Sequence, residues 1–89
     1  SAPDLKRDTE AATMRGFAER YEVRMLDRYQ ALSLGDSREQ AQKIGFVGPD
    51  DTVYGSGVTV YRFSAGRYDI RLGFDSNKRL VSKSIEKKP

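Results

Sequence analysis

The chain has 89 residues, of which 37% are hydrophobic and 33% charged, and its formal net charge is +3. This length allows one modest hydrophobic core, and five Tyr and four Phe argue against wholesale disorder. Because Cys and His are both absent, the sequence excludes disulfides, thiolate nucleophiles, zinc-thiolate sites and histidine-based triads. Carboxylate, Lys and Tyr side chains are the groups that remain for catalysis. We therefore expect a single domain over residues 1–89.

A long amphipathic helix is predicted from Asp4 to Leu34, a stretch without an internal proline. Gly16 weakens its first part, and we expect residues 1–13 to fray. A sheet about 20 Å long cannot cover a helix of ~25 residues, so we expect an uncovered apolar end that a partner could bind. The apolar positions are Met14, Phe17, Ala18, Tyr21, Met25, Tyr29 and Leu32, and the expected solvated face carries Arg15, Glu19, Glu22, Arg28 and Gln30.

A second, short helix is predicted to begin near Arg38. Gly35 suits the left-handed residue that ends the first helix, and Ser37 with Gln40 forms an S-x-x-Q capping box. This helix is expected to end at residues 44–45. The following segment, GFVGPDDTVYGSG, has the Gly, Pro and Asp content of a loop.

Three β-strands are predicted after this loop. VTVYRFS is rich in β-branched and aromatic residues, residues 68–75 alternate between apolar and polar side chains, and RLVSKSI follows a second turn. The resulting prediction is an α+β fold, with two N-terminal helices packed on one face of a three-stranded antiparallel β-meander. Residues 86–89 are expected to be a fraying tail.

Three short motifs carry possible site chemistry, and turn formation explains each of them better. The acidic pair Asp50-Asp51 could serve acid-base catalysis or bind a cation, but it follows a proline in a turn-like segment. The glycines of residues 45–48 and 55–57 lack the P-loop context for phosphate binding. Residues 75–77 lack the glutamate that completes a calcium loop. We expect that the chain is not an enzyme and that it has neither a cofactor site nor a metal site.

A small cationic patch is predicted on the polar face of the sheet, formed by Arg62, Arg71 and Lys83 if the strands pair in register. Tyr61 and Phe63 are expected to point to the opposite face of the sheet from Arg62. A solvated sheet surface is the preferred interpretation, because long cationic side chains commonly cover open β-surface. Basic and aromatic residues on a sheet can also bind RNA, but the RNP sequence pattern is absent, so nucleic acid is the less favoured partner.

Residues 29–86 resemble the SmpA/OmlA (BamE-like) envelope lipoproteins and the wider β-lactamase-inhibitor-protein-like fold. The resemblance lies in a G-D-S-x-x-Q-A-x-x-I-G segment, a nearby proline, an aromatic strand and F-D-S-N-K-R-L before the last strand. Ala41 stands where the family usually has Val, Asn77 where a turn glycine is common, and no lipobox cysteine is present. The matching positions are Gly35, Ser37, Gln40, Ile44, Gly45, Pro49, Tyr61, Phe74, Asp75, Lys78 and Leu80.

The resemblance implies a non-enzymatic protein-binding module of the bacterial envelope or periplasm, such as a scaffold in outer-membrane protein assembly. Its partner would be an envelope protein, and the basic patch could also meet anionic lipid headgroups. The alternatives are an inhibitor or immunity-type domain that blocks an enzyme and a small nucleic-acid-binding module. We expect residues 47–57 to face the partner, with Tyr54 as aromatic anchor. The predicted partner-binding residues are Tyr54, Tyr61, Arg62, Arg71 and Lys83.

No run of about 18 apolar residues occurs, and residues 1–20 lack the apolar region of a signal peptide. From the sequence we therefore expect a chain that, as given, neither spans a membrane nor carries an export signal. A precursor with a signal peptide and a lipobox cysteine would support the envelope interpretation.

Overall fold

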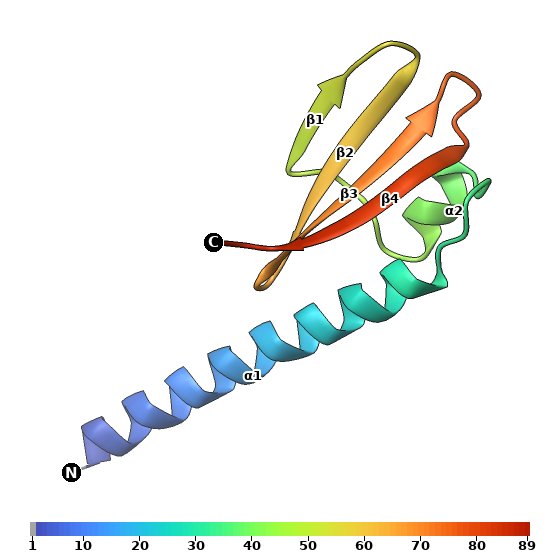
Figure 1. Ribbon diagram of the computed structural model, residues 1–89. Helices are drawn as coiled ribbons and strands as arrows, with labels where there is room; N and C mark the ends of the chain where they lie inside the picture. The colour runs from blue at the N-terminus through green and yellow to red at the C-terminus, as the bar shows by residue number, and fades with distance from the viewer. Residues whose placement is uncertain (1) are drawn as a thin grey trace.

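The computed structural model describes the backbone of residues 2–89 and the side chains from Gly16 onward. It has an α+β fold with a four-stranded antiparallel sheet in the order β1-β2-β3-β4 (Figure 1). A long helix precedes the sheet, and a short one lies between them in the chain. The elements are α1 (Ala2–Ala31), α2 (Arg38–Lys43), β1 (Asp51–Tyr54), β2 (Val58–Ala65), β3 (Tyr68–Asp75) and β4 (Leu80–Lys87).

The prediction of three strands was wrong, because the expected loop contains a further strand. β1 pairs with β2, from Asp51 opposite Arg62 to Tyr54 opposite Thr59. Its four residues lie between Gly48-Pro49 and Gly55, so the alternation typical of a strand is too short to stand out from the turn residues. β1 forms one edge of the sheet and β4 the other.

The two faces of the sheet follow from its register. Tyr61 lies opposite Leu72, and Leu72 lies opposite Lys83. Two residues further along β2, Phe63 lies opposite Ile70. Antiparallel partners share a face, so these residues all point toward the core side. Arg62 and Arg71 are opposite one another on the other side, as the alternation predicted.

A register shift interrupts the pairing of β3 with β4. Gly73 lies opposite Ser82, whereas Phe74 lies opposite Leu80, which leaves Val81 as the extra residue of a β-bulge. Leu80 therefore points to the core side, and after the bulge so does Lys83. Without the bulge, Lys83 would point to the outer face.

Both helices contribute to one hydrophobic core on the inner face of the sheet. α1 supplies Met25 and Leu32, α2 supplies Ala41, and Phe46 follows α2. The Phe46 ring packs edge-on against the Phe63 ring, with a centroid separation of 5.1 Å. The buried residues are Met25, Leu32, Ala41, Phe46, Phe63, Ala65, Ile70, Leu72, Phe74 and Leu80.

The predicted start of the second helix is confirmed at its N-cap. Ser37 has an extended backbone, and its hydroxyl oxygen accepts a hydrogen bond from the Gln40 amide at 3.1 Å. Gly35, with φ of +94°, has the predicted left-handed conformation. The first helix, however, ends at Ala31 rather than Leu34.

The N-terminal half of α1 extends beyond the sheet, as Figure 1 shows. Phe17 and Tyr21 are 60% and 45% exposed, and Met14 lies outside the described side chains. Of the predicted apolar positions whose side chains the structure describes, the core covers Met25, Tyr29 and Leu32. Within the described part of the chain, no helix is long and apolar enough to cross a membrane.

The C-terminal residues are paired where the sequence led us to expect a fraying tail. β4 runs to Lys87, and the amide of Lys88 donates to the carbonyl of Arg67 at 2.7 Å. The Lys88 ammonium also donates to the hydroxyl oxygen of Ser64. These bonds tie the end of the chain to the β2–β3 hairpin.

Candidate protein-binding surface

The five predicted partner-binding residues lie on two different faces of the sheet. Tyr54 and Tyr61 share the core-side face with Lys83, whereas Arg62 and Arg71 lie on the outer face. The structure therefore brings the two tyrosines to one face but separates the predicted cationic patch. The two faces differ in what their side chains can bind.

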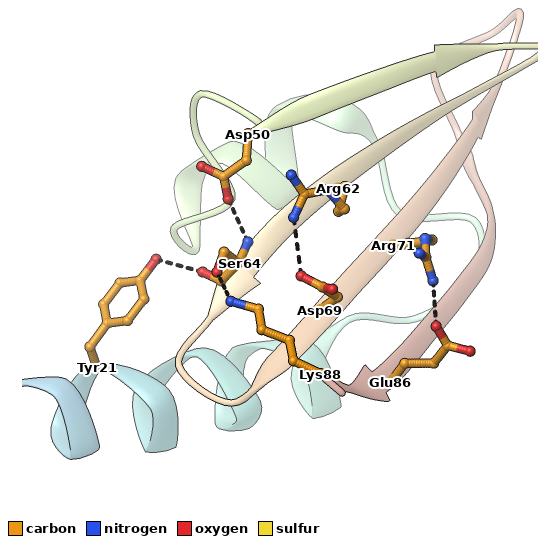
Figure 2. A network of polar contacts seen from close by, with 8 residues as sticks. All are labelled: Tyr21, Asp50, Arg62, Ser64, Asp69, Arg71, Glu86 and Lys88. Carbon is orange, nitrogen blue, oxygen red and sulfur yellow. Dashed lines mark hydrogen bonds and ion pairs between the residues drawn. The ribbon is translucent and has the colours of Figure 1, made fainter.

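The two outer-face arginines are already paired with carboxylates. Arg62 Nη1 lies 3.1 Å from Asp69 Oδ1, and Arg71 Nη1 lies 2.8 Å from Glu86 Oε2 (Figure 2). The hydrogen bond that Arg71 donates to Glu86 raises the pKa of Arg71. These partly exposed pairs add little stability, but they neutralise the surface that the sequence predicted to be cationic. Its attraction for a polyanion is correspondingly weak.

Lys83 has a structural role that the prediction did not include. Because of the bulge at Val81, its side chain points inward, and Nζ donates to the carbonyls of Tyr29 and Leu32 at 3.1 and 2.8 Å. Nζ also lies 4.6 Å from the centre of the Tyr29 ring. A cation at the carboxyl end of a helix satisfies free carbonyl groups and complements the helix dipole. The predicted grouping of Lys83 with Arg62 and Arg71 was thus wrong.

A hollow of about 530 Å³ lies between α2 and the inner face of β2 and β3. We call it the α2 hollow. Its wall on α2 carries Arg38, and its floor includes Tyr61. Sequence analysis proposed Tyr61 but missed Arg38, although a cation in the first turn of a helix opposes the helix dipole and could have signalled a special role. The lining residues are Arg38, Glu39, Gln42, Thr59, Tyr61, Phe74, Asp75, Ser76 and Lys78.

Arg38 is held in place by aromatic rings. Its guanidinium carbon lies 4.3 Å from the centre of the Tyr61 ring and 5.6 Å from that of Phe74. Nη1 donates to the carbonyl of Phe46 at 3.1 Å. Stacking on Tyr61 and this hydrogen bond fix the orientation of the guanidinium group, which borders the hollow.

Tyr54 is the most exposed large apolar residue among the described side chains, with 81% of its surface accessible. It lies on the edge strand β1, opposite Thr59, which lines the α2 hollow. Cross-strand neighbours have Cβ atoms about 5 Å apart, so Tyr54 stands beside the hollow on the same face. The tyrosine and the hollow form one continuous candidate surface.

The carboxylates of the acidic pair Asp50-Asp51 are bound to backbone amides, but Asp51 is the first residue of β1 and not the turn residue that was predicted. A carboxylate oxygen of Asp51 accepts from the Thr52 amide at 2.8 Å, and Asp50 accepts from the Ser64 amide. Tyr21, reaching from α1, donates its hydroxyl to the Ser64 carbonyl at 3.4 Å (Figure 2). Asp50 and Tyr21 thereby bind the amide and the carbonyl of Ser64, which lies in β2 beyond the residues that pair with β1.

The Ser64 hydroxyl and the Lys88 ammonium resemble a serine-lysine catalytic pair only superficially. A serine nucleophile needs a neighbouring lysine base and a pair of free backbone amides to stabilise an oxyanion. The Ser64 amide is already bound to Asp50, and neither Ser64 nor Lys88 lines the hollow along α1 or the hollows beside Arg38. We interpret the network in Figure 2 as a structural connection between α1, the sheet and the end of the chain.

The contact of α1 with the β2–β3 turn depends on Glu22, which was predicted to be solvated and is instead only 8% exposed. Its carboxylate accepts from Arg67 Nη2 at 2.8 Å, from Arg67 Nε and from the Arg67 backbone amide. These hydrogen bonds, first from the side chain and then from the backbone, lower the pKa of Glu22. Glu22 in turn raises the pKa of Arg67.

Comparison with protein-family models, curated proteins and solved structures finds no match for this chain. In the part of the chain that the structure describes, no three His, Cys, Asp or Glu residues are grouped in a way that could hold a metal ion.

Proposed function

We propose that this chain is a non-enzymatic protein-binding module that uses Tyr54 as its anchor. The observation that carries the proposal is the position of Tyr54, 81% exposed on an edge strand and next to the α2 hollow. Tyrosine is enriched among the residues that contribute most to protein interfaces, because a large ring and one hydroxyl give much contact for little lost conformational freedom. A neighbouring hollow can receive side chains of the partner.

We further propose an envelope protein as the partner and the bacterial periplasm as the location. This part rests on the resemblance of residues 29–86 to SmpA/OmlA-like proteins. A role as scaffold in outer-membrane protein assembly and a role as enzyme inhibitor are both compatible with binding through the exposed Tyr54. Nucleic acid is disfavoured as partner because Arg62 and Arg71 are neutralised by Asp69 and Glu86. The same ion pairs weaken the case for anionic headgroups binding there.

Photo-crosslinking tests this proposal directly. A benzophenone amino acid at position 54 in the full chain should crosslink a discrete protein in an envelope extract, and excess unlabelled wild-type chain should compete the product away. Leu34, which is 64% exposed, is a control position of similar accessibility. The same product from position 34, or no competable product from position 54, would contradict the proposal.

A further inference from the structure

We infer that the α2 hollow binds an acidic side chain, Asp or Glu, from an extended segment of the protein partner. This inference rests on the proposed function, since it assigns chemistry to the part of the partner that lies beside Tyr54. It depends on three features of the hollow: the fixed orientation of Arg38, the charges at its rim and the covered faces of its aromatic rings.

Arg38 is prepared to bind a carboxylate. Stacking at 4.3 Å from the Tyr61 ring centre and the hydrogen bond to the Phe46 carbonyl already restrict its side chain. Binding therefore costs less side-chain entropy than it would at a mobile surface arginine. A guanidinium group has five N–H donors in a planar fork that fits a carboxylate, and the bond to Phe46 uses only one of them.

The hollow is lined by two cations, Arg38 and Lys78, and by two carboxylates, Glu39 and Asp75, so its formal charge is balanced. Among the side chains that the structure describes, no carboxylate lies within ion-pair distance of Arg38 or Lys78, in contrast to Arg62, Arg67 and Arg71. Asp75 keeps its negative charge, but its Oδ1 is held by the amides of Asn77 and Arg79 within the turn. Arg38 and Lys78 therefore keep donors for a carboxylate of the partner, and the attraction comes from these donors rather than from an excess of charge.

The aromatic residues of the hollow favour a carboxylate over a nucleic-acid base. Base stacking needs an open aromatic face. Arg38 covers the ring of Tyr61, and Phe74 is only 2% exposed. A side chain that enters the hollow therefore meets Arg38, which lines it, instead of an open ring. Tyr54, outside the hollow, can pack against an apolar residue next to the acidic one.

Binding of a positional-scanning library of fluorescent, acetylated pentapeptide amides to the full chain would test the inference. We expect Asp and Glu to be enriched at one position, and a selected peptide to bind roughly tenfold more weakly when that residue becomes Asn or Gln. Arg38→Gln should remove this preference. Lys78→Asn should weaken binding several-fold, and Asn tolerates the positive φ of 61° at this position. Arg71→Gln, on the outer face, is the matched control and should leave binding unchanged.

The inference is overturned if no position selects an acidic residue, or if Arg38→Gln retains the selection. It is equally overturned if a short mixed-sequence oligonucleotide binds the hollow more tightly than the acidic peptides. Should Arg38→Gln fail to fold by circular dichroism, Lys78→Asn decides, because Lys78 is exposed. A competable crosslink from position 54 together with no acidic selection would leave the proposed function standing and remove only this inference.

Discussion

The carboxylate of Glu22 occupies the space that a side chain at Gly66 would need. A Cβ atom added to Gly66 would lie 2.4 Å from Glu22 Oε2 and 2.9 Å from Glu22 Cβ. Gly66 also has φ of +62°, a left-handed conformation that side chains disfavour. Figure 1 shows α1 passing directly beneath this β2–β3 turn. The helix and the hairpin are therefore fitted to one another at this contact.

Gly66→Ala should destabilise the fold by more than the cost of its backbone conformation alone. Left-handed φ costs an alanine about 1–2 kcal/mol, and displacement of Glu22 adds to this. Gly57, with φ of +78° and no atom within 4 Å of an added Cβ, is the matched control. Denaturant melts should show a larger loss for Gly66→Ala than for Gly57→Ala. In a Glu22→Ala background the extra loss should disappear, and persistence there would contradict the proposed steric conflict.

The lowered pKa of Glu22 makes part of the stability depend on pH. The pKa of Glu22 is lower in the folded chain than in the unfolded chain, where it is about 4.3. Ionised Glu22 therefore stabilises the fold fully at pH values above this unfolded pKa. This contribution is lost as the pH falls through the folded pKa. The difference in unfolding free energy between wild type and Glu22→Gln should therefore shrink between about pH 6 and pH 3. A constant difference across that range would contradict the assignment.

Lys83→Met should destabilise the domain by about 1 kcal/mol, because it removes two hydrogen bonds to the end of α1 and a cation near the helix carboxyl end. Lys87→Met is the control, since Lys87 is an exposed residue of the same strand. Thermal melts of both variants measure the effect. Equal melting temperatures for the two variants would show that Lys83 does not cap α1.

The error about Lys83 shows what alternation alone could not predict. Two-residue periodicity correctly placed Tyr61 and Arg62 on opposite faces, because β2 and β3 pair without interruption. After the bulge at Val81, the residues of β4 point to the opposite faces from those that simple alternation predicts. The segment RLVSKSI has no Gly or Pro that would indicate a bulge. Likewise, Glu22 looks like one more charge on a polar helix face. Only its contact with Arg67, 45 positions away in the sequence, gives it a buried role.

The strand register makes opposite predictions for two neighbouring residues of β3. Leu72→Ala should cost roughly 2–5 kcal/mol, because Leu72 is fully buried in the core. Arg71→Ala should cost less than about 0.5 kcal/mol, since its ion pair with Glu86 is largely exposed. Denaturant melts with unchanged slope m give both values. Costs in the reverse order would mean that the inner and outer faces have been exchanged.

The sequence predicted the tyrosines of the candidate surface but not the α2 hollow. Tyr54 and Tyr61 were identified as aromatic residues in a loop and a strand, and both lie on the inner face. Arg38 belongs to the site because α2 packs across the ends of β2 and β3, and a local pattern does not contain this tertiary placement. The strand β1 that carries Tyr54 was hidden between Gly and Pro residues.

The affinity of the Tyr54→Ala variant for the crosslinked partner, measured at two salt concentrations, tests the central claim most directly. We expect a loss of about 2 kcal/mol, which is roughly thirtyfold in Kd, at both concentrations, with salt acting mainly on the association rate. Mixed RNA and DNA oligonucleotides are titrated in parallel. An unchanged Kd for Tyr54→Ala, with oligonucleotide binding that falls log-linearly with salt at a slope of roughly −0.7 to −0.9 per phosphate, would contradict the claim and favour nucleic acid.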